Sequence, residues 1–128
     1  MNKERVRFAP SPTGALHIGG LRTALFNYLY TKNKKGTFIL RLEDTDRKRF
    51  VKGSENYIDN ALNWLGISPN EWPVVGGKFG PYRQSERIEI YQEKIEELLK
   101  SKKAYYAFDT NESLAKLRSY KESEGKVF

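Results

Sequence analysis

The sequence predicts an α/β fold in which a crossover helix joins two parallel strands. Three patterns support it: a short strand over residues 6–9, an amphipathic helix around residues 21–29, and a second strand over residues 37–42. A strand, a helix and a strand in this order form a right-handed parallel crossover. Ligands of such units bind beyond the carboxyl ends of the strands, which here are residues 9–14 and 43–46.

Local patterns define each element of this unit. After the first strand, Pro10, Pro12 and Gly14 stop any helix and force an extended, turning loop. The helix that follows ends in lysines and Gly36, the usual chemistry of a helix C-terminus. Its apolar residues fall at helical spacing and form one stripe: Leu21, Ala24, Leu25, Tyr28 and Leu29.

The second half of the chain reads as helices separated by a long irregular stretch. A helix is predicted over residues 54–65, and prolines and glycines then fill residues 66–84, a length that suggests a task for the loop. Ser85 can cap a helix to about residue 102, a strand is possible over 104–108, and Thr110 or Asn111 can cap a last helix to about Tyr120. The apolar residues predicted to face inward on the helices over residues 54–65 and 85–102 are Tyr57, Ile58, Ala61, Leu62, Leu65, Ile88, Tyr91, Ile95, Leu98 and Leu99.

Composition excludes several classes of protein. The 128 residues contain no cysteine, which excludes a disulfide scaffold and a thiolate zinc site. The lack of cysteine fits a reducing cytoplasm, where the protein is expected to be located. No apolar run approaches the roughly 20 residues of a membrane helix, and Met1 to Arg7 is no secretory signal, so no membrane contact is expected. The net charge of +7 suggests a polyanionic partner such as nucleic acid, although a basic surface kept for solubility is an alternative.

The predicted sheet is small for its type. Parallel sheets are normally wider than two or three strands and are covered on both faces. We therefore expect the chain to be the front part of a larger fold, and the apolar pair Val127 and Phe128 at its end supports the same expectation.

The loop after the first strand has the composition of a phosphate-binding site. Glycines allow backbone N–H groups to approach a ligand closely, and the following helix N-terminus attracts anions. His17, the only histidine, can donate a hydrogen bond to a phosphate, and Ser11 and Thr13 add hydroxyls. The alternative is a plain connector with a packed or exposed histidine. Neither a Walker loop nor the dinucleotide-binding fingerprint is present.

Three acids follow the second strand directly. Glu43, Asp44 and Asp46 repel one another unless something offsets their charge. Three readings stay open: a surface cluster neutralised by nearby arginines, a Mg²⁺ site, or a site where one acid binds a substrate ammonium. Strand alternation places Arg41 and Glu43 on one face and the leucines at 40 and 42 on the other. The neutralising arginines would be Arg41, Arg47 and Arg49.

Three ordered motifs resemble one enzyme family. Residues 8–14 followed by His17-Ile18-Gly19-Gly20 resemble the first signature, named HIGH, of class I aminoacyl-tRNA synthetases. Residues 7–20, Arg41-Leu42-Glu43-Asp44-Thr45-Asp46-Arg47 and Gly80-Pro81-Tyr82-Arg83-Gln84-Ser85-Glu86-Arg87 are similar to the glutamyl branch in particular. Gly20 stands where the general pattern has a second histidine, a change common in that branch.

The resemblance implies a fold and a reaction. Residues 1–103 would form the first half of a Rossmann-like catalytic domain, a parallel sheet with flanking helices, and residues 104–128 would start the insertion that binds the tRNA acceptor stem. The enzyme would use ATP to activate glutamate to glutamyl-adenylate and transfer it to the 3′ end of tRNA(Glu). The second signature loop of the Lys-Met-Ser-Lys-Ser type is not in this sequence, so the isolated piece is expected to be inactive.

The resemblance also implies roles for individual residues, and it places Arg7, His17 and Glu43 around one common cavity. Mg²⁺ would accompany ATP. No metal ligands and no zinc are expected, because alanine and aspartate within residues 104–109 stand where some relatives carry zinc-binding cysteines. The residues implied to contact glutamate are Arg7, Ala9, Ser11 and Glu43. Those implied to contact ATP are Ser11, Thr13, His17, Gly19 and Gly20, and the last three of these would be catalytic. Asp46 and Arg49 are implied to contact tRNA.

Other functions remain alternatives at this stage. A shorter relative that glutamylates queuosine on tRNA(Asp) shares the front half but usually carries zinc cysteines. A glutaminyl enzyme fits less well, because the Arg7 carboxylate site would be misplaced. A non-catalytic nucleotide- or RNA-binding module is the alternative from a different class. Glutamate- and tRNA-dependent ATP–pyrophosphate exchange separates these possibilities.

Overall fold

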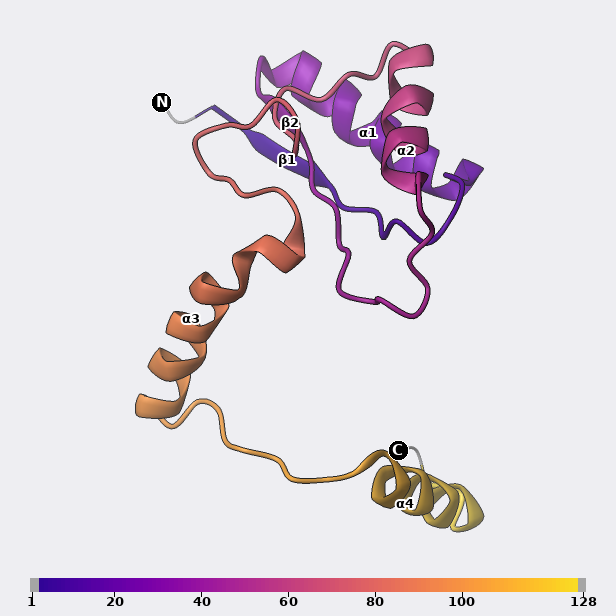
Figure 1. Cartoon of the computed structure of the whole chain (residues 1–128), viewed down its shortest axis with the longest axis vertical. Helices are drawn as coiled ribbons and strands as arrows, with labels where there is room; N and C mark the ends of the chain where they lie inside the picture. Colours follow the sequence, from indigo (N-terminus) through magenta and orange to yellow (C-terminus); the bar gives the residue numbers. More distant parts are fainter. Residues whose placement is uncertain (1–2, 127–128) are drawn as a thin grey trace. The chain divides into compact units, whose positions relative to one another are not determined.

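The computed structural model describes residues 3–126 and contains two strands and four α-helices within that range. The chain divides into two compact units, one ending at Tyr91 and one beginning at Gln92. Within the described residues, none of the helices has the length and apolar character needed to cross a membrane. The elements are β1 (Arg5–Phe8), α1 (Ile18–Lys34), β2 (Thr37–Leu40), α2 (Ser54–Trp64), a 3₁₀ turn (Gln84–Arg87), α3 (Ile88–Lys100) and α4 (Asn111–Ser123) (Figure 1).

The predicted parallel pair of strands is confirmed. β1 and β2 pair in parallel from Arg5 opposite Thr37 to Phe8 opposite Leu40, and α1 connects them. Hydrogen bonds continue past the strand ends, since the Arg41 N–H donates to the Phe8 carbonyl at 3.0 Å and the Glu43 N–H to the Pro10 carbonyl at 3.0 Å. The two carboxyl ends named by the sequence therefore lie side by side.

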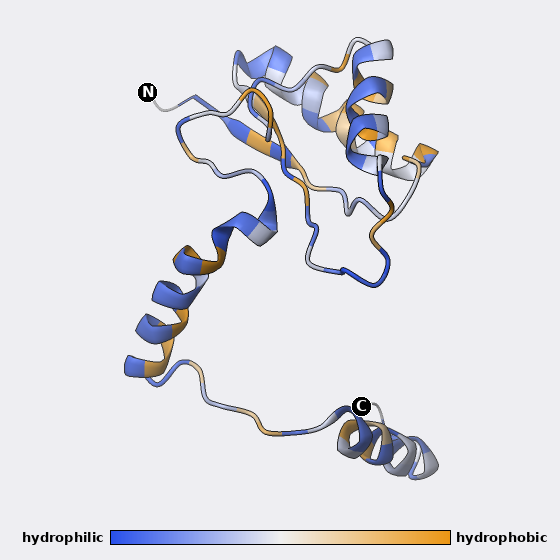
Figure 2. Ribbon diagram, viewed as in Figure 1, coloured by the Kyte–Doolittle hydropathy of each residue, from blue (hydrophilic) through white to orange (hydrophobic). Residues whose placement is uncertain are grey.

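One face of this sheet carries the apolar core, covered by α1 and α2 (Figure 2). The predicted helix stripes are confirmed in part. On α1 Ala24 is buried while Leu25 and Leu29 are exposed, and on α2 Ile58 is buried while Tyr57 is exposed. The core consists of Phe8, Ala24, Phe38, Leu40, Leu42, Ile58, Leu62 and Ile67.

The long irregular stretch covers the second edge of β2. The Leu40 N–H donates to the Glu71 carbonyl at 3.0 Å, and the Leu42 N–H donates to the Tyr82 carbonyl at 2.9 Å. An open strand edge presents unpaired backbone groups, and this loop satisfies them. Prolines and glycines disfavour a regular strand, so this segment pairs with the edge of β2 through separate backbone hydrogen bonds.

Three predictions about the later elements are wrong. No strand forms over residues 104–108. Ser85 does not cap an α-helix, because it lies in the 3₁₀ turn and binds Asp44. No residue of α3 is buried, so Ile88 and Ile95, predicted to face inward, are exposed.

The predicted cap of the last helix is confirmed. The Thr110 hydroxyl accepts a hydrogen bond from the Ser113 N–H at 3.1 Å, and α4 then runs to Ser123, slightly past the predicted end. Two sequence predictions concern chain ends that lie outside the described residues. These ends are Met1 and Asn2, in the stretch judged not to be a secretory signal, and the apolar pair Val127 and Phe128. The proposed domain boundary after residue 103 stays a prediction.

Candidate functional site

His17 forms the N-cap of α1. Its backbone is extended, and its Nδ1 accepts a hydrogen bond from the Gly19 N–H at 3.1 Å. Because Nδ1 accepts, a neutral imidazole must carry its proton on Nε2. The cap thus orients the ring with Nε2 as its donor nitrogen, and the side chain is exposed at the start of the helix.

The two glycines after His17 leave space for this arrangement. A Cβ added to Gly19 would lie 2.9 Å from Cε1 of the His17 ring, and one added to Gly20 would lie 2.8 Å from the Leu16 side chain. A side chain at either position would therefore push against a neighbour. Gly20, which stands where the general signature has a second histidine, therefore leaves room for the Leu16 side chain.

A cavity of about 410 Å³ opens beside this helix start. It brings together four of the residues predicted to bind ATP, namely Ser11, Thr13, His17 and Gly20. Gly19 lies next to it, with its amide engaged by His17. The remaining lining residues are Phe8, Pro10, Gly14, Ala15, Leu16 and Ile58.

The Ser54 hydroxyl holds the wall of this cavity in place. It donates to the Pro12 carbonyl at 2.8 Å and to the Val51 carbonyl at 2.7 Å, and the side chain is buried at the first residue of α2. This connects the loop after β1 to α2. No local pattern in the sequence marks the link from Ser54 to the loop after β1, because the Pro12 carbonyl lies 42 positions away.

Arg7 and Glu43 lie on the sheet face opposite the core. The Arg7 Nη2 is 4.0 Å from the Glu43 Oε1, and both side chains are partly exposed, at 47% and 36%. Arg7 also lines a second cavity, of about 180 Å³. Since successive strand residues point to opposite faces, Phe8 enters the core while Arg7 points away from it.

The expectation of one common cavity is therefore not met. His17 lines the larger cavity and Arg7 lines the smaller one, while Glu43 lines neither of these two. Alternation along β1 explains the division, because neighbouring residues of a strand cannot face the same side. The loop over residues 9–11 lies between the two cavities in sequence, with Ala9 partly buried and Ser11 exposed.

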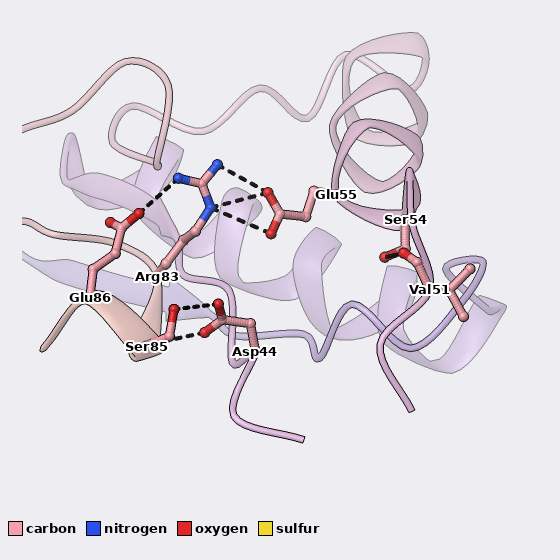
Figure 3. Close-up of polar contacts among 7 residues, drawn as sticks. All are labelled: Asp44, Val51, Ser54, Glu55, Arg83, Ser85 and Glu86. Atoms are coloured by element: carbon pink, nitrogen blue, oxygen red, sulfur yellow. Dashed lines mark hydrogen bonds and ion pairs between the residues drawn. The ribbon is translucent and has the colours of Figure 1, made fainter. Parts of the chain in front are cut away.

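Asp44 is a structural anchor among the three acids. It is buried, and its carboxylate accepts hydrogen bonds from the Ser85 N–H at 2.8 Å and the Ser85 hydroxyl at 2.6 Å (Figure 3). Burial by itself raises the pKa of Asp44, but the Ser85 bonds and the charge of Arg47 outweigh it and hold the pKa below its usual value. Asp44 therefore fixes the end of β2 to the 3₁₀ turn.

The other two acids have different surroundings. Asp46 pairs with Arg49 at 2.6 Å between Oδ2 and Nε, and this hydrogen bond is the main cause that lowers the pKa of Asp46. Glu43 has the longer contact with Arg7 and is the acid best placed to receive a ligand cation. Arg41, expected among the neutralising arginines, instead donates to the Tyr91 hydroxyl.

Two ion-pair networks hold residues 71–87 against the rest of the unit. Arg5 donates to both Glu71 oxygens, at 2.7 and 2.6 Å, and the Tyr82 hydroxyl donates to the same carboxylate. The hydrogen bond from Arg5 lowers the pKa of Glu71. Arg83 lies between Glu55 of α2 and Glu86, at 3.0 Å from each (Figure 3). No local pattern in the sequence marks the Arg5–Glu71 and Arg83–Glu55 pairs, because each joins segments far apart in the chain.

Comparison with known proteins identifies similar sequences. The family described as "tRNA synthetases class I (E and Q), catalytic domain" matches residues 3–127. A protein from Flavobacterium psychrophilum named "Glutamate--tRNA ligase" is 61% identical over 100% of this chain, which covers 26% of that protein. A protein of the same name from Chlorobium phaeobacteroides is 56% identical over 94% of this chain. The chain spans about a quarter of the length of such relatives.

Solved structures are similar to the whole described chain. A glutamate tRNA ligase from Elizabethkingia meningosepticum, in complex with its amino acid, has a TM-score of 0.87 and 55% identity, and the match covers 99% of this chain and 25% of that one. Glutamate-tRNA synthetase from Elizabethkingia anophelis has a TM-score of 0.89 at 55% identity, and 26% of it is covered. The α/β fold inferred from the sequence is thus confirmed.

Proposed function

Because this chain belongs to the family of class I tRNA synthetases (E and Q), catalytic domain, we propose that it forms part of a glutamate–tRNA ligase. The observation that carries this proposal is the 61% identity to a glutamate–tRNA ligase over all 128 residues. The names of the relatives do not favour the alternatives, a queuosine-directed enzyme or a non-catalytic RNA-binding module. A cytoplasmic location is part of the same proposal.

In the first step, the glutamate α-carboxylate attacks the α-phosphorus of ATP, and pyrophosphate leaves. Arg7 holds the side-chain carboxylate of glutamate through its planar fork of donors, and Glu43 holds the ammonium. The 4.0 Å contact between these two groups supports the assignment, since a ligand that carries both charges can satisfy both partners. Ala9 and Ser11 complete the glutamate contacts at the end of β1.

ATP occupies the loop cavity in this proposal, with its phosphates near Ser11, Thr13 and the start of α1. The His17 Nε2–H donates to a phosphate oxygen as negative charge develops there, helped by the helix N-terminus at Gly19 and Gly20. Within residues 3–126, no three acidic or histidine side chains are grouped for a metal ion. Mg²⁺ would therefore arrive on the ATP phosphates.

Arg7 lines the smaller cavity, and Pro10 and Ser11, a few residues later, line the larger one. In this proposal glutamate and ATP approach each other across residues 9–11. In the second step, the 3′-terminal hydroxyl of tRNA(Glu) attacks the acyl carbon of the adenylate, the glutamyl ester forms, and AMP leaves. Asp46 and Arg49 form an exposed, mutually bonded pair just beyond the glutamate contacts, and we assign them to the tRNA acceptor end. Such contacts position the RNA without reading its sequence. Residues 104–128 would begin the acceptor-stem insertion.

A chimeric enzyme tests the proposal. This chain would replace the matching quarter of the Flavobacterium psychrophilum ligase, and glutamate-dependent ATP–pyrophosphate exchange would be measured with tRNA(Glu) present. We expect exchange within about tenfold of the natural ligase, and glutamylated tRNA as the product. A folded chimera that binds tRNA but catalyses no exchange would reject the proposed function, with the unmodified ligase as the control.

A further inference from the structure

The sheet face opposite the core holds more positive charge than the proposed function uses. Four guanidinium groups line the cavity of about 180 Å³, those of Arg5, Arg7, Arg41 and Arg87. All lining residues belong to the described part of the chain, and none of them is acidic. The cavity therefore favours an anion.

The charges of Arg5 and Arg7 are already partly offset by acidic side chains. Arg5 forms a bidentate ion pair with Glu71, at 2.7 and 2.6 Å, so its charge is largely offset. Arg7 has the longer contact with Glu43 at 4.0 Å. The excess charge of the cavity thus comes mainly from the other two guanidiniums.

Arg41 and Arg87 have only neutral hydrogen-bond partners among residues 3–126. Arg41 donates from Nη2 to the Tyr91 hydroxyl, and Arg87 donates from Nη1 to two backbone carbonyls. The Nε of each is buried without a hydrogen-bond partner in the same range. A charged group that has lost water and has no counter-charge is costly, so an anion that enters the cavity is bound more strongly than at a solvated arginine.

Arg41 also lies on the same face of the sheet as the residues proposed to bind glutamate. Its N–H donates to the Phe8 carbonyl at 3.0 Å, which continues the parallel pairing of β1 and β2 by one residue. Its side chain therefore shares a face with Arg7 on the neighbouring strand and with Glu43 two residues later. Arg41 lies beside the two groups assigned to the substrate.

We propose that Arg41 is a second ligand of the substrate's side-chain carboxylate and that it selects glutamate over its uncharged amide analogue. This inference rests on the proposed function. A carboxylate has two oxygens with about four acceptor positions, enough for two guanidinium groups. An amide side chain offers one oxygen, and its NH₂ group would face a guanidinium donor without an acceptor. Two arginines therefore discriminate more strongly than one.

The test uses the chimeric enzyme with Arg41→Gln, which removes the charge, and Arg41→Lys, which keeps it without the planar fork. Pyrophosphate exchange in the presence of tRNA gives KM for glutamate and for ATP. We expect Arg41→Gln to raise KM for glutamate about 10- to 100-fold, to leave KM for ATP within twofold, and to lower the preference for glutamate over glutamine. Arg41→Lys should fall between it and the unmodified chimera. Arg22→Gln, at an exposed position of α1, is the control.

A second measurement separates this inference from the proposed function. Glutamate alone and ATP alone are each added to the chimera, and the rise in Tm is recorded. Arg41→Gln should lose most of the rise caused by glutamate and keep the rise caused by ATP, whether or not the chimera catalyses exchange. An unchanged response to glutamate, or equal losses for both ligands, would overturn the role of Arg41. An inactive chimera with the expected Tm pattern would count against the proposed function alone.

Discussion

The two faces of the β1–β2 sheet come from the same short strands but differ in almost every property. Phe8, Phe38 and Leu40 point to one face and are at most 5% exposed. Arg7 and Arg41 point to the other, where a small cavity without acidic lining residues remains open. One face stabilises the fold by burying apolar area, and the other carries the charged side chains that we propose bind the substrate. Substitutions on the two faces should therefore separate stability from binding.

The largest expected effect is on the core face. Phe38→Ala removes a ring that is 1% exposed and leaves a cavity, so the free energy of unfolding should fall by about 3–5 kcal/mol. Urea unfolding of this chain measures the change. Arg7→Ala on the opposite face is the control and should change the same quantity by only about 0.5 kcal/mol. Equal losses would show that both faces stabilise the fold.

His17 tests a residue on the rim of the loop cavity. In the chimeric enzyme, His17→Ala should slow adenylate formation about tenfold to a thousandfold, the effect of losing one transition-state donor. Single-turnover release of pyrophosphate measures the rate. His17→Asn keeps an N-cap acceptor without the imidazole Nε2, so it should restore helix stability but not the rate. If asparagine restores the rate, the cap matters and the ring does not.

Arg7 tests the charged face directly. Arg7→Ala should raise KM for glutamate about 10- to 100-fold, because a charged hydrogen-bonding partner of the carboxylate is lost, and should change KM for ATP much less. Arg7→Lys keeps the charge but not the planar fork, so an intermediate KM is expected. Both constants come from pyrophosphate exchange. Equal effects on glutamate and ATP would remove Arg7 from the carboxylate role.

The smallest expected effect concerns Asp44, which anchors the end of the sheet between the two faces. Its pKa is lowered in the folded state, so its contribution to stability is present above the unfolded pKa of about 3.9 and is lost as pH falls through the folded value. Asp44→Asn should lower the free energy of unfolding by about 1 kcal/mol at pH 7. The difference should shrink below about pH 4. A difference that stays constant from pH 7 to pH 3 would contradict this role.

Much of the first unit could be predicted because its signals are local. The apolar spacing and the lysines before Gly36 mark α1, and alternation separates Arg7 from Phe8 and Arg41 from Leu42. The His17 loop was recognisable because its glycines and the helix start are adjacent in sequence. The predicted strand over residues 104–108 failed, because such a strand needs a partner that propensity alone cannot supply.

The order of the elements, the parallel pairing and the position of the loop that we propose binds phosphate followed from the sequence by itself, since the patterns that indicate each element are local. Tertiary structure alone decided which of the three acids is buried as a structural anchor, Asp44, and which has only a long contact with an arginine, Glu43. Ser85 is 41 positions from Asp44 and donates hydrogen bonds to its carboxylate. Ser85 lies in a 3₁₀ turn, where the sequence predicted the start of an α-helix. Tertiary structure also placed the predicted site residues at two cavities and left Arg41 without a counter-charge among residues 3–126, because contacts between distant segments determine what a side chain meets.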